Sequence, residues 1–146
     1  VPYQTFDTAD HPICLAPGND RLWARCAAVL GRPDWATDPR FAKSAERVAN
    51  KTDLLPMIAA ALKLQTRAHW LAAMDKAGVP CSPVNDIGEV ATSEQFAASK
   101  LVQQLPDGGP KVVGIPITFD HVRPRSARPS PKLGEHTAEV LGRPAK

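Results

Sequence analysis

Residues 121–132 limit the choice of fold more than any other part of the chain. This stretch, HVRPRSARPSPK, holds three prolines and three arginines and shows no apolar repeat. Proline lacks a backbone donor and fixes φ, so such a stretch neither continues a helix nor joins the middle of a sheet. We therefore expect an extended linker over 121–132, followed by a short helix over 134–141.

The part of the chain before the linker is expected to be mainly helical. Apolar residues recur at helical spacing in the segments 22–30, 44–64 and 67–77. Pro56 lies within the second segment, so that helix either begins near Thr52 or bends at the proline. Trp35 and Phe41, in the proline-broken connector that follows the first helix, are expected to pack on the core.

Short β-prone runs accompany these helices. A hairpin is predicted from the runs at 3–7 and 13–16. A short extended piece is predicted over 81–84. Two more strands are predicted over 101–105 and 111–113, on either side of an Asp-Gly-Gly turn. A further edge strand is expected over 115–119, and Asn85 and Ser93 are expected to cap short helices over 86–90 and 94–99. The fold class is thus α+β: a small helical domain with a short antiparallel sheet, and an extended C-terminal segment that ends in a short helix.

Charge is concentrated at the C-terminal end. Residues 121–146 hold 6 of the 18 Lys and Arg but only 2 of the 15 Asp and Glu. Basic residues at 123, 125, 128 and 132 can attract phosphate, but no aromatic residues lie among them to stack on bases, so we expect no nucleic-acid partner. A solvated or docking tail is the alternative.

Membrane and secretory signals are absent from the sequence. No apolar run approaches the roughly 18 residues of a membrane span, and the N-terminus does not resemble a signal peptide. The three cysteines form no CxxC pair, so neither a metal site nor a disulfide framework is expected. These features predict a cytoplasmic chain with no membrane partner.

Gly18, Asn19 and Asp20 form the best local candidate for a binding site. A helix N-terminus can hold an anion, and Gly18 would let a ligand approach the backbone. Against this, Asn19 is a good N-cap, and Asp20 in the first turn complements the helix dipole and repels an anion. Physical reasoning favours capping over substrate binding at these three residues.

Two further candidates have structural alternatives. Cys81 lies in the apolar surroundings V-P-C-S-P-V, which do not favour a reactive thiolate. Glu135 and His136 are a possible acid/base pair, but sequence neighbours point to different faces of a helix, and a helix that opens after Gly134 explains both. No nucleotide-binding or serine-hydrolase motif is present, and we assign no catalytic residue and no metal ligand.

Several motifs occur together in a fixed order between Tyr3 and Leu141. They are G-N-D-R-L-W, L-G-R-P-D-W, T-D-P-R-F, A-G-V-P-C-S-P-V-N, G-I-P-I-T-F and L-G-E-H-T-A-E-V-L. In this order they resemble the C-terminal portion of a family III CoA-transferase of the formyl-CoA transferase or L-carnitine dehydratase type. The resemblance covers nearly the whole chain.

The resemblance implies a two-domain enzyme in which the chain builds a small α+β domain and then returns to a large Rossmann-like domain. Residues 1–105 match the small domain, and 106–146 match the returning segment. Two subunits of the family interlock as a homodimer, and the N-terminal large domain is the implied partner of this chain. We therefore expect exposed apolar side chains around Ile115, Ile117 and Phe119.

The implied reaction moves CoA from an acyl-CoA to a carboxylic acid through an aspartyl-CoA thioester. The nucleophilic Asp of the family, and most of its CoA pocket, lie in the large domain. The chain begins at Val1 rather than at methionine, and we expect a processed chain, a trimmed chain or the later part of a longer protein. Alone, it is expected to be inactive and to bind no cofactor, with the coenzyme A thioester a substrate of the whole enzyme.

Other interpretations remain open at this stage. The alternatives are that the whole protein is a relative of the α-methylacyl-CoA racemases or acyl-CoA dehydratases, or that this chain is a non-catalytic interaction module. The racemases carry Glu at the position that aligns with Asn19, which places this chain closer to the transferases and dehydratases. No acyl donor or acceptor is favoured by these residues.

Overall fold

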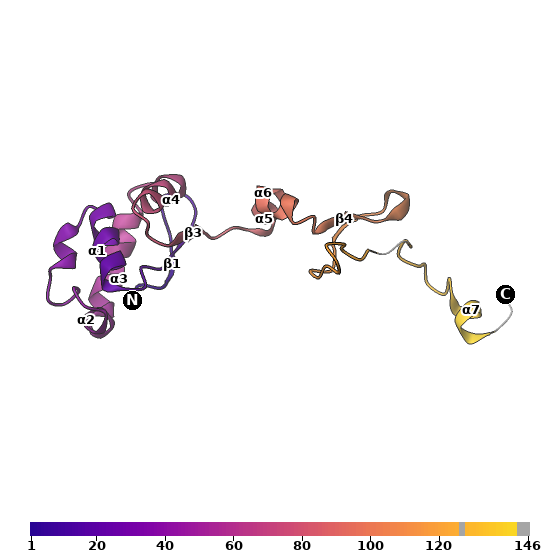
Figure 1. The fold of residues 1–146 in the computed structure, drawn as a ribbon, viewed down its shortest axis with the longest axis horizontal. Coiled ribbons are helices and arrows are strands. Elements are labelled where there is room, and N and C mark those ends of the chain that lie inside the picture. The colour runs from indigo at the N-terminus through magenta and orange to yellow at the C-terminus, as the bar shows by residue number, and fades with distance from the viewer. Residues whose placement is uncertain (126–127, 143–146) are drawn as a thin grey trace. The chain divides into compact units, whose positions relative to one another are not determined.

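The structure is a computed structural model that describes residues 1–125 and 128–142. It contains two compact units, Val1–Val84 and Asn85–Lys146, which are described separately. Figure 1 shows the helices α1 to α4 gathered with short strands in the N-terminal unit. The α+β class expected from the sequence is confirmed, since helices accompany two small antiparallel sheets.

The sheet of the N-terminal unit has the order β1-β2-β3 and is antiparallel throughout. Strands β1 (Gln4–Phe6) and β2 (Ile13–Leu15) form the predicted hairpin, and β3 (Cys81–Pro83) pairs with β2 from the far end of the unit. Ile13 and Leu15 are fully buried while Cys14 between them is partly exposed. This alternation is what a sheet with one buried face requires.

Helix α1 (Asp20–Val29) occupies the segment predicted from its apolar repeat. The predicted stop is present, with Gly31 in the left-handed region at φ +73°. A short 3₁₀ helix, η1 (Pro33–Ala36), follows. As expected, Trp35 and Phe41 of this connector are buried in the core.

The helical stretch predicted over 44–64 is divided at Asn50 into α2 (Ser44–Ala49) and α3 (Lys51–Leu62). Pro56 lies inside α3, whose start at Lys51 agrees with the first of the two alternatives. The proline leaves one carbonyl without its helical partner and α3 nevertheless continues. Its inner face explains why, because Leu54, Ile58 and Leu62 recur every four residues and are fully buried.

Helix α4 (Arg67–Lys76) has well-formed ends. The Thr66 side chain caps it as predicted, accepting a hydrogen bond from the His69 amide. At the other end Gly78 adopts φ +63°, and the Val79 amide donates to the Met74 carbonyl at 2.9 Å. This closure satisfies the last carbonyls and turns the chain directly into β3.

The hairpin loop is tied to the start of α4 through Asp10. One carboxylate oxygen, Oδ1, accepts from the Arg67 amide at 2.7 Å, from the Thr8 hydroxyl at 2.8 Å and from the His11 amide at 2.8 Å. The hydrogen bond from Arg67, then those from Thr8 and His11, lower the pKa of Asp10 to about 2. The loop and helix are thus held together by an ionised carboxylate.

One core unites the elements of the N-terminal unit. Aromatic and aliphatic side chains from the sheet, from helices α1, α3 and α4 and from the connector pack together. Its buried members are Phe6, Ile13, Leu15, Trp23, Cys26, Ala27, Leu30, Trp35, Phe41, Leu54, Ile58, Leu62, Trp70, Met74 and Val79.

The second unit consists of short elements. They are α5 (Ile87–Thr92), α6 (Glu94–Ala98), β4 (Val102–Gln104), η2 (Pro106–Gly108), β5 (Lys111–Val113) and α7 (Thr137–Leu141). The β4–β5 hairpin and the Ser93 cap of α6 were predicted correctly. The cap of α5 was misplaced by one residue, because Asp86 rather than Asn85 forms a capping box with Glu89.

The strand predicted over 115–119 is absent, and the C-terminal helix is shorter than predicted. Residues 115–119 form no strand; Phe119 makes only an isolated bridge to Val122. Pro116 offers no N–H to a neighbouring strand, and the segment lies without a ladder. The predicted short C-terminal helix is present as α7, but it begins at Thr137 rather than at Gly134, so Glu135 lies in the turn before it.

The linker and its surroundings are largely exposed. Residues 121–125 and 128–132 contain no helix or strand, as predicted, while 126–127 lie outside the described residues. Among the described residues from 85 onward, no side chain is fully buried. Ile115, Ile117 and Phe119 are 52%, 55% and 65% exposed, which confirms the expected apolar patch.

The carboxylate of Asp10 gives the chain a testable pH dependence. Because its folded pKa lies below its unfolded value of about 3.9, its contribution is complete above about pH 4 and is lost as pH falls toward 2. In urea unfolding of the wild type and Asp10→Asn, we expect the wild type to be more stable at pH 6 and this difference to shrink toward pH 2. A difference in stability that stays constant with pH would contradict a stabilising role for the ionised Asp10 carboxylate.

Candidate functional site

The turn that sequence reasoning selected, Gly18–Asn19–Asp20, lies at the start of α1. Asn19 is extended, and its side-chain Oδ1 accepts a hydrogen bond from the Leu22 amide at 2.9 Å. Its carbonyl accepts from the Trp23 amide at 2.8 Å. The predicted N-cap is therefore present, and two of the helix's first amides are satisfied within the turn.

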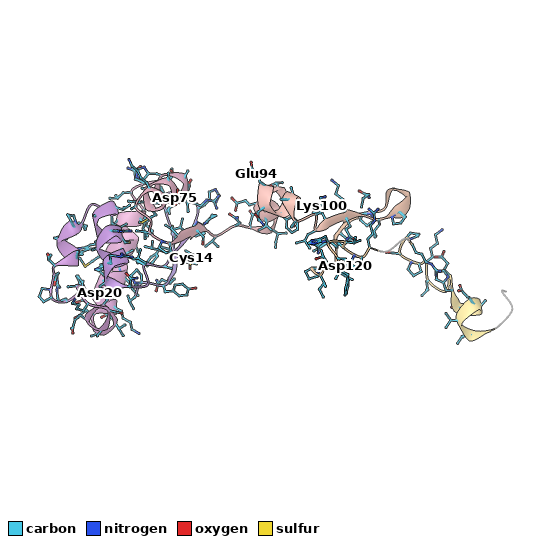
Figure 2. All side chains as sticks on the ribbon, viewed as in Figure 1. Cys14, Asp20, Asp75, Glu94, Lys100 and Asp120 are labelled. Atoms are coloured by element: carbon cyan, nitrogen blue, oxygen red, sulfur yellow. The ribbon has the colours of Figure 1, made fainter. Side chains whose placement is uncertain are left out.

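Asp20 is held by two cations. Its Oδ1 lies 3.0 Å from Nη2 of Arg47, and its Oδ2 lies 4.0 Å from Nζ of Lys43. Lys43 is the N-cap residue of α2 and Arg47 lies in its last turn, and Figure 2 shows Asp20 beside this helix. The expectation that Asp20 repels an anion at this helix end is thus weakened, because its charge is already compensated by these neighbours.

Arg47 is the residue that sequence reasoning missed. Its side chain is only 1% exposed and lies over the Trp23 ring, with 5.3 Å between Cζ and the ring centroid. Besides Asp20 it donates to three backbone carbonyls: Val1 at 2.7 Å, Phe41 at 3.0 Å and Ala42 at 3.2 Å. A buried guanidinium is tolerated because all three of its nitrogens find acceptors.

The aromatic neighbours of Arg47 extend this arrangement. The rings of Trp23 and Trp35 are nearly parallel, 4° apart, with centroids separated by 6.2 Å. Beyond them Arg32 lies over Trp35 at 4.7 Å and forms a two-point ion pair with Asp34. Trp23 of α1 and Trp35 of η1 thus form a ring pair with one guanidinium over each ring, which is an electrostatically favourable arrangement.

Gly18 leaves the outer side of the turn open. The residue is exposed, and a Cβ added to it would meet no atom within 4 Å. Its φ lies outside the left-handed region, so the backbone does not require glycine there. The turn can accept a small side chain, and any ligand could reach it from solvent.

The remaining candidates are not brought together into a site. Burial raises the pKa of Cys81 to about 11 and that of Cys26 to about 12, so both stay thiols near neutral pH. Glu135 accepts from the Lys132 amide at 2.6 Å, whereas His136 lies 3.4 Å from Glu139. The suggested pair therefore points to different partners.

Within 1–125 and 128–142 no three His, Cys, Asp or Glu side chains gather as metal ligands would. In the same ranges no helix has the length and apolar character needed to cross a bilayer.

Comparison with known proteins decides the family. The family model described as CoA-transferase family III matches residues 1–137. The chain belongs to CoA-transferase family III. This agrees with the resemblance drawn from the ordered motifs between Tyr3 and Leu141.

Two curated relatives of this family III chain carry transferase names. An acetyl-CoA:oxalate CoA-transferase of Acetobacter aceti is 37% identical over 96% of this chain and 36% of its own length. A succinate–glutarate CoA-transferase of Agrobacterium fabrum is 36% identical over 96% of this chain and 36% of its own length. The chain thus spans about a third of the length of the curated relatives it matches.

A solved structure supports the fold of the family III chain. A CaiB/BaiF family protein from Brucella suis matches with a TM-score of 0.85 and 32% identity, covering 97% of this chain and 37% of that one. The fold of this chain is therefore one that a crystallised protein also shows.

Removal of the buried arginine should be costly. Arg47→Met leaves three carbonyls and a carboxylate without their donor, and we expect the free energy of unfolding to fall by about 3–5 kcal/mol. Arg40→Met is the matched control, since Arg40 also pairs with a carboxylate, Asp38, but is 55% exposed. The control should cost much less, because a solvent-exposed ion pair contributes little to stability. Equal losses in urea unfolding would refute the special role of Arg47.

Substitutions in the turn should separate capping from binding. Asn19→Ala removes the cap and should lower the free energy of unfolding by about 1 kcal/mol. Gly18→Ala should change stability by less than about 0.5 kcal/mol, because the added Cβ fits. Thermal unfolding of the two variants measures this. A strongly destabilised Gly18→Ala would mean that the turn is more crowded than described.

Proposed function

We propose that this chain is the C-terminal part of a CoA-transferase that moves CoA from an acyl-CoA to a carboxylic acid. The observation that carries the proposal is the identity of 36–37%, over 96% of the chain, to relatives named for CoA transfer. Identity of this kind, spread over both units, supports a shared reaction more strongly than any single motif does.

The acids named in those relatives suggest a substrate class. One name contains oxalate, another succinate and glutarate, and a further relative from Bradyrhizobium diazoefficiens, 31% identical over 82% of this chain, is a formyl-CoA:oxalate CoA-transferase. All three acids are short dicarboxylates. We therefore infer that the acceptor, the donor acyl group or both derive from a short dicarboxylic acid.

We place the boundary between the small domain and the returning segment inside the second unit, Asn85–Lys146. Residues 1–105 would form the small domain, and 106–146 would return to an N-terminal large domain, the main partner of this chain. Support comes from the exposed apolar side chains of the second unit, because Ile115, Ile117 and Phe119 would need another surface to cover them. In this arrangement the whole protein is an interlocked homodimer of the cytoplasm.

The chemistry would begin at an Asp of the large domain. Its carboxylate attacks the acyl-CoA carbonyl and gives a mixed anhydride and the CoA thiolate, which then forms an aspartyl-CoA thioester and releases the donor acid. The acceptor carboxylate repeats the sequence in reverse and leaves with CoA. The 146-residue chain contributes the turn at Gly18–Asn19–Asp20 as a wall of the pocket, and alone it would catalyse nothing.

Three alternatives have weaker support. A racemase relative is disfavoured by Asn19, which stands where racemases carry Glu. Nucleic-acid binding by the basic linker is disfavoured because Arg123 already donates to the carbonyls of Ser99 and Ile115. A non-catalytic module would share the fold but would not support transfer in the complete protein.

A CoA-exchange assay tests the proposal. The complete protein that contains this chain should convert succinyl-CoA or acetyl-CoA and a dicarboxylate into the new thioester, seen by liquid chromatography, while residues 1–146 alone should not. Proton exchange at C2 of a 2-methylacyl-CoA in D₂O should be absent. Transfer by the 146-residue chain would refute the assignment of the nucleophile to the large domain, and exchange without transfer would indicate a racemase.

A further inference from the structure

The side chain of Arg47 joins three segments that are far apart in the sequence. It reaches back 46 residues to the Val1 carbonyl and 27 residues to Asp20, and it also holds Phe41 and Ala42 at the end of the connector before α2. These bonds use Nε, Nη1 and Nη2. The planar fork of the guanidinium thus sets the distances between all three segments.

The geometry around Arg47 leaves it little freedom. The guanidinium is packed on the Trp23 ring, and Trp23 itself is fully buried against Trp35. A side chain restrained by packing and by four hydrogen bonds holds its partners more accurately than an exposed ion pair does. The start of α1 is therefore fixed relative to Val1 by one residue.

The contact with Asp20 determines which side of the turn faces outward. Oδ1 of Asp20 is drawn toward the buried Arg47, while Gly18 and Asn19 remain exposed. Asn19 is itself committed to Leu22 and Trp23 through its cap bonds. A shift of Asp20 would consequently move the whole turn.

We propose that Arg47 is a positioning residue for CoA transfer: it holds the turn Gly18–Asn19–Asp20 at a set place relative to Val1. The proposal rests on the proposed function, in which the chain before Val1 belongs to the large domain that carries the nucleophile. Arg47 touches no reacting atom in this scheme and acts through the turn. Small misplacements of groups around a reaction centre are known to cost large factors in rate.

The test uses the complete protein with Arg47→Ala and Arg47→Lys, and with Arg40→Ala as matched control. Arg40 also forms a two-point pair with a carboxylate and lies over an aromatic ring, Phe41, but at the surface. Turnover is expressed per folded molecule, counted by circular dichroism at the assay temperature. This separates positioning from loss of stability.

We expect kcat per folded molecule to fall at least about tenfold in Arg47→Ala, with the KM for acyl-CoA changing less than about threefold. Ethylguanidinium, which replaces the deleted atoms, should restore kcat at least about threefold, whereas ethylammonium and Arg47→Lys should not, because an ammonium cannot match the fork. Arg40→Ala should keep kcat. An unchanged kcat in Arg47→Ala, or equal rescue by ethylammonium, would overturn the proposal.

A second variant covers the case in which Arg47→Ala does not fold. Asp20→Asn keeps the buried arginine and removes only the charge of its partner in the turn, and it should lower kcat by at least about threefold. An unchanged kcat in this variant would also overturn the proposal.

A readout independent of activity separates the two claims. If the wild-type complete protein transfers no CoA, the proposed function fails, and amide hydrogen exchange then decides the positioning role. Exchange at Leu22 and Trp23 should rise at least about tenfold in Asp20→Asn or Arg47→Ala, relative to the Trp70 amide in α4. Exchange unchanged at Leu22 and Trp23 would overturn the inference.

Discussion

A single buried cation organises the N-terminal unit. An arginine that is almost fully removed from water must have its hydrogen bonds satisfied, and Arg47 obtains this from one carboxylate and three carbonyls. The three carbonyls belong to segments without regular structure, the first residue and the connector before α2, while the carboxylate belongs to Asp20, the first residue of α1. The need to satisfy one charge therefore orders the parts of the unit that helices and strands leave undefined.

Local sequence signals predicted much of this unit but not its central contact. The Asn19 and Thr66 caps, the hairpin and the Gly78 stop depend on neighbours a few residues away, so pattern reasoning found them. Arg47 lies in Ser-Ala-Glu-Arg-Val-Ala, which looks like any solvated helix, and its partners are as many as 46 residues distant. Burial of a charge by remote segments leaves no local signal, and the candidate turn was accordingly found without the residue that holds it.

The errors in the second unit have a related cause. The segment 115–119 has the alternation of a strand, but alternation does not supply a neighbour, and among the described residues only Val122 pairs with Phe119. The predicted cap of α5 was one residue too early, because Asn85 and Asp86 are equally good caps in sequence. Glu89 decides between them by completing a capping box with Asp86. Membership of CoA-transferase family III, by contrast, was visible in motif order, since that order reflects the whole chain.

The paired indoles show how such a small core balances two demands. Nε1 of Trp23 and Nε1 of Trp35 are both buried, and neither has a hydrogen-bond partner among the described residues. An orphaned donor carries a desolvation penalty that a phenyl ring would avoid. In return, the two tryptophans provide broad flat rings, and one guanidinium group lies over each of them. At Trp23 and Trp35 the shape of the ring therefore matters more than its hydrogen bond. Substitutions that keep a large flat ring should be better tolerated there than those that keep only a polar group.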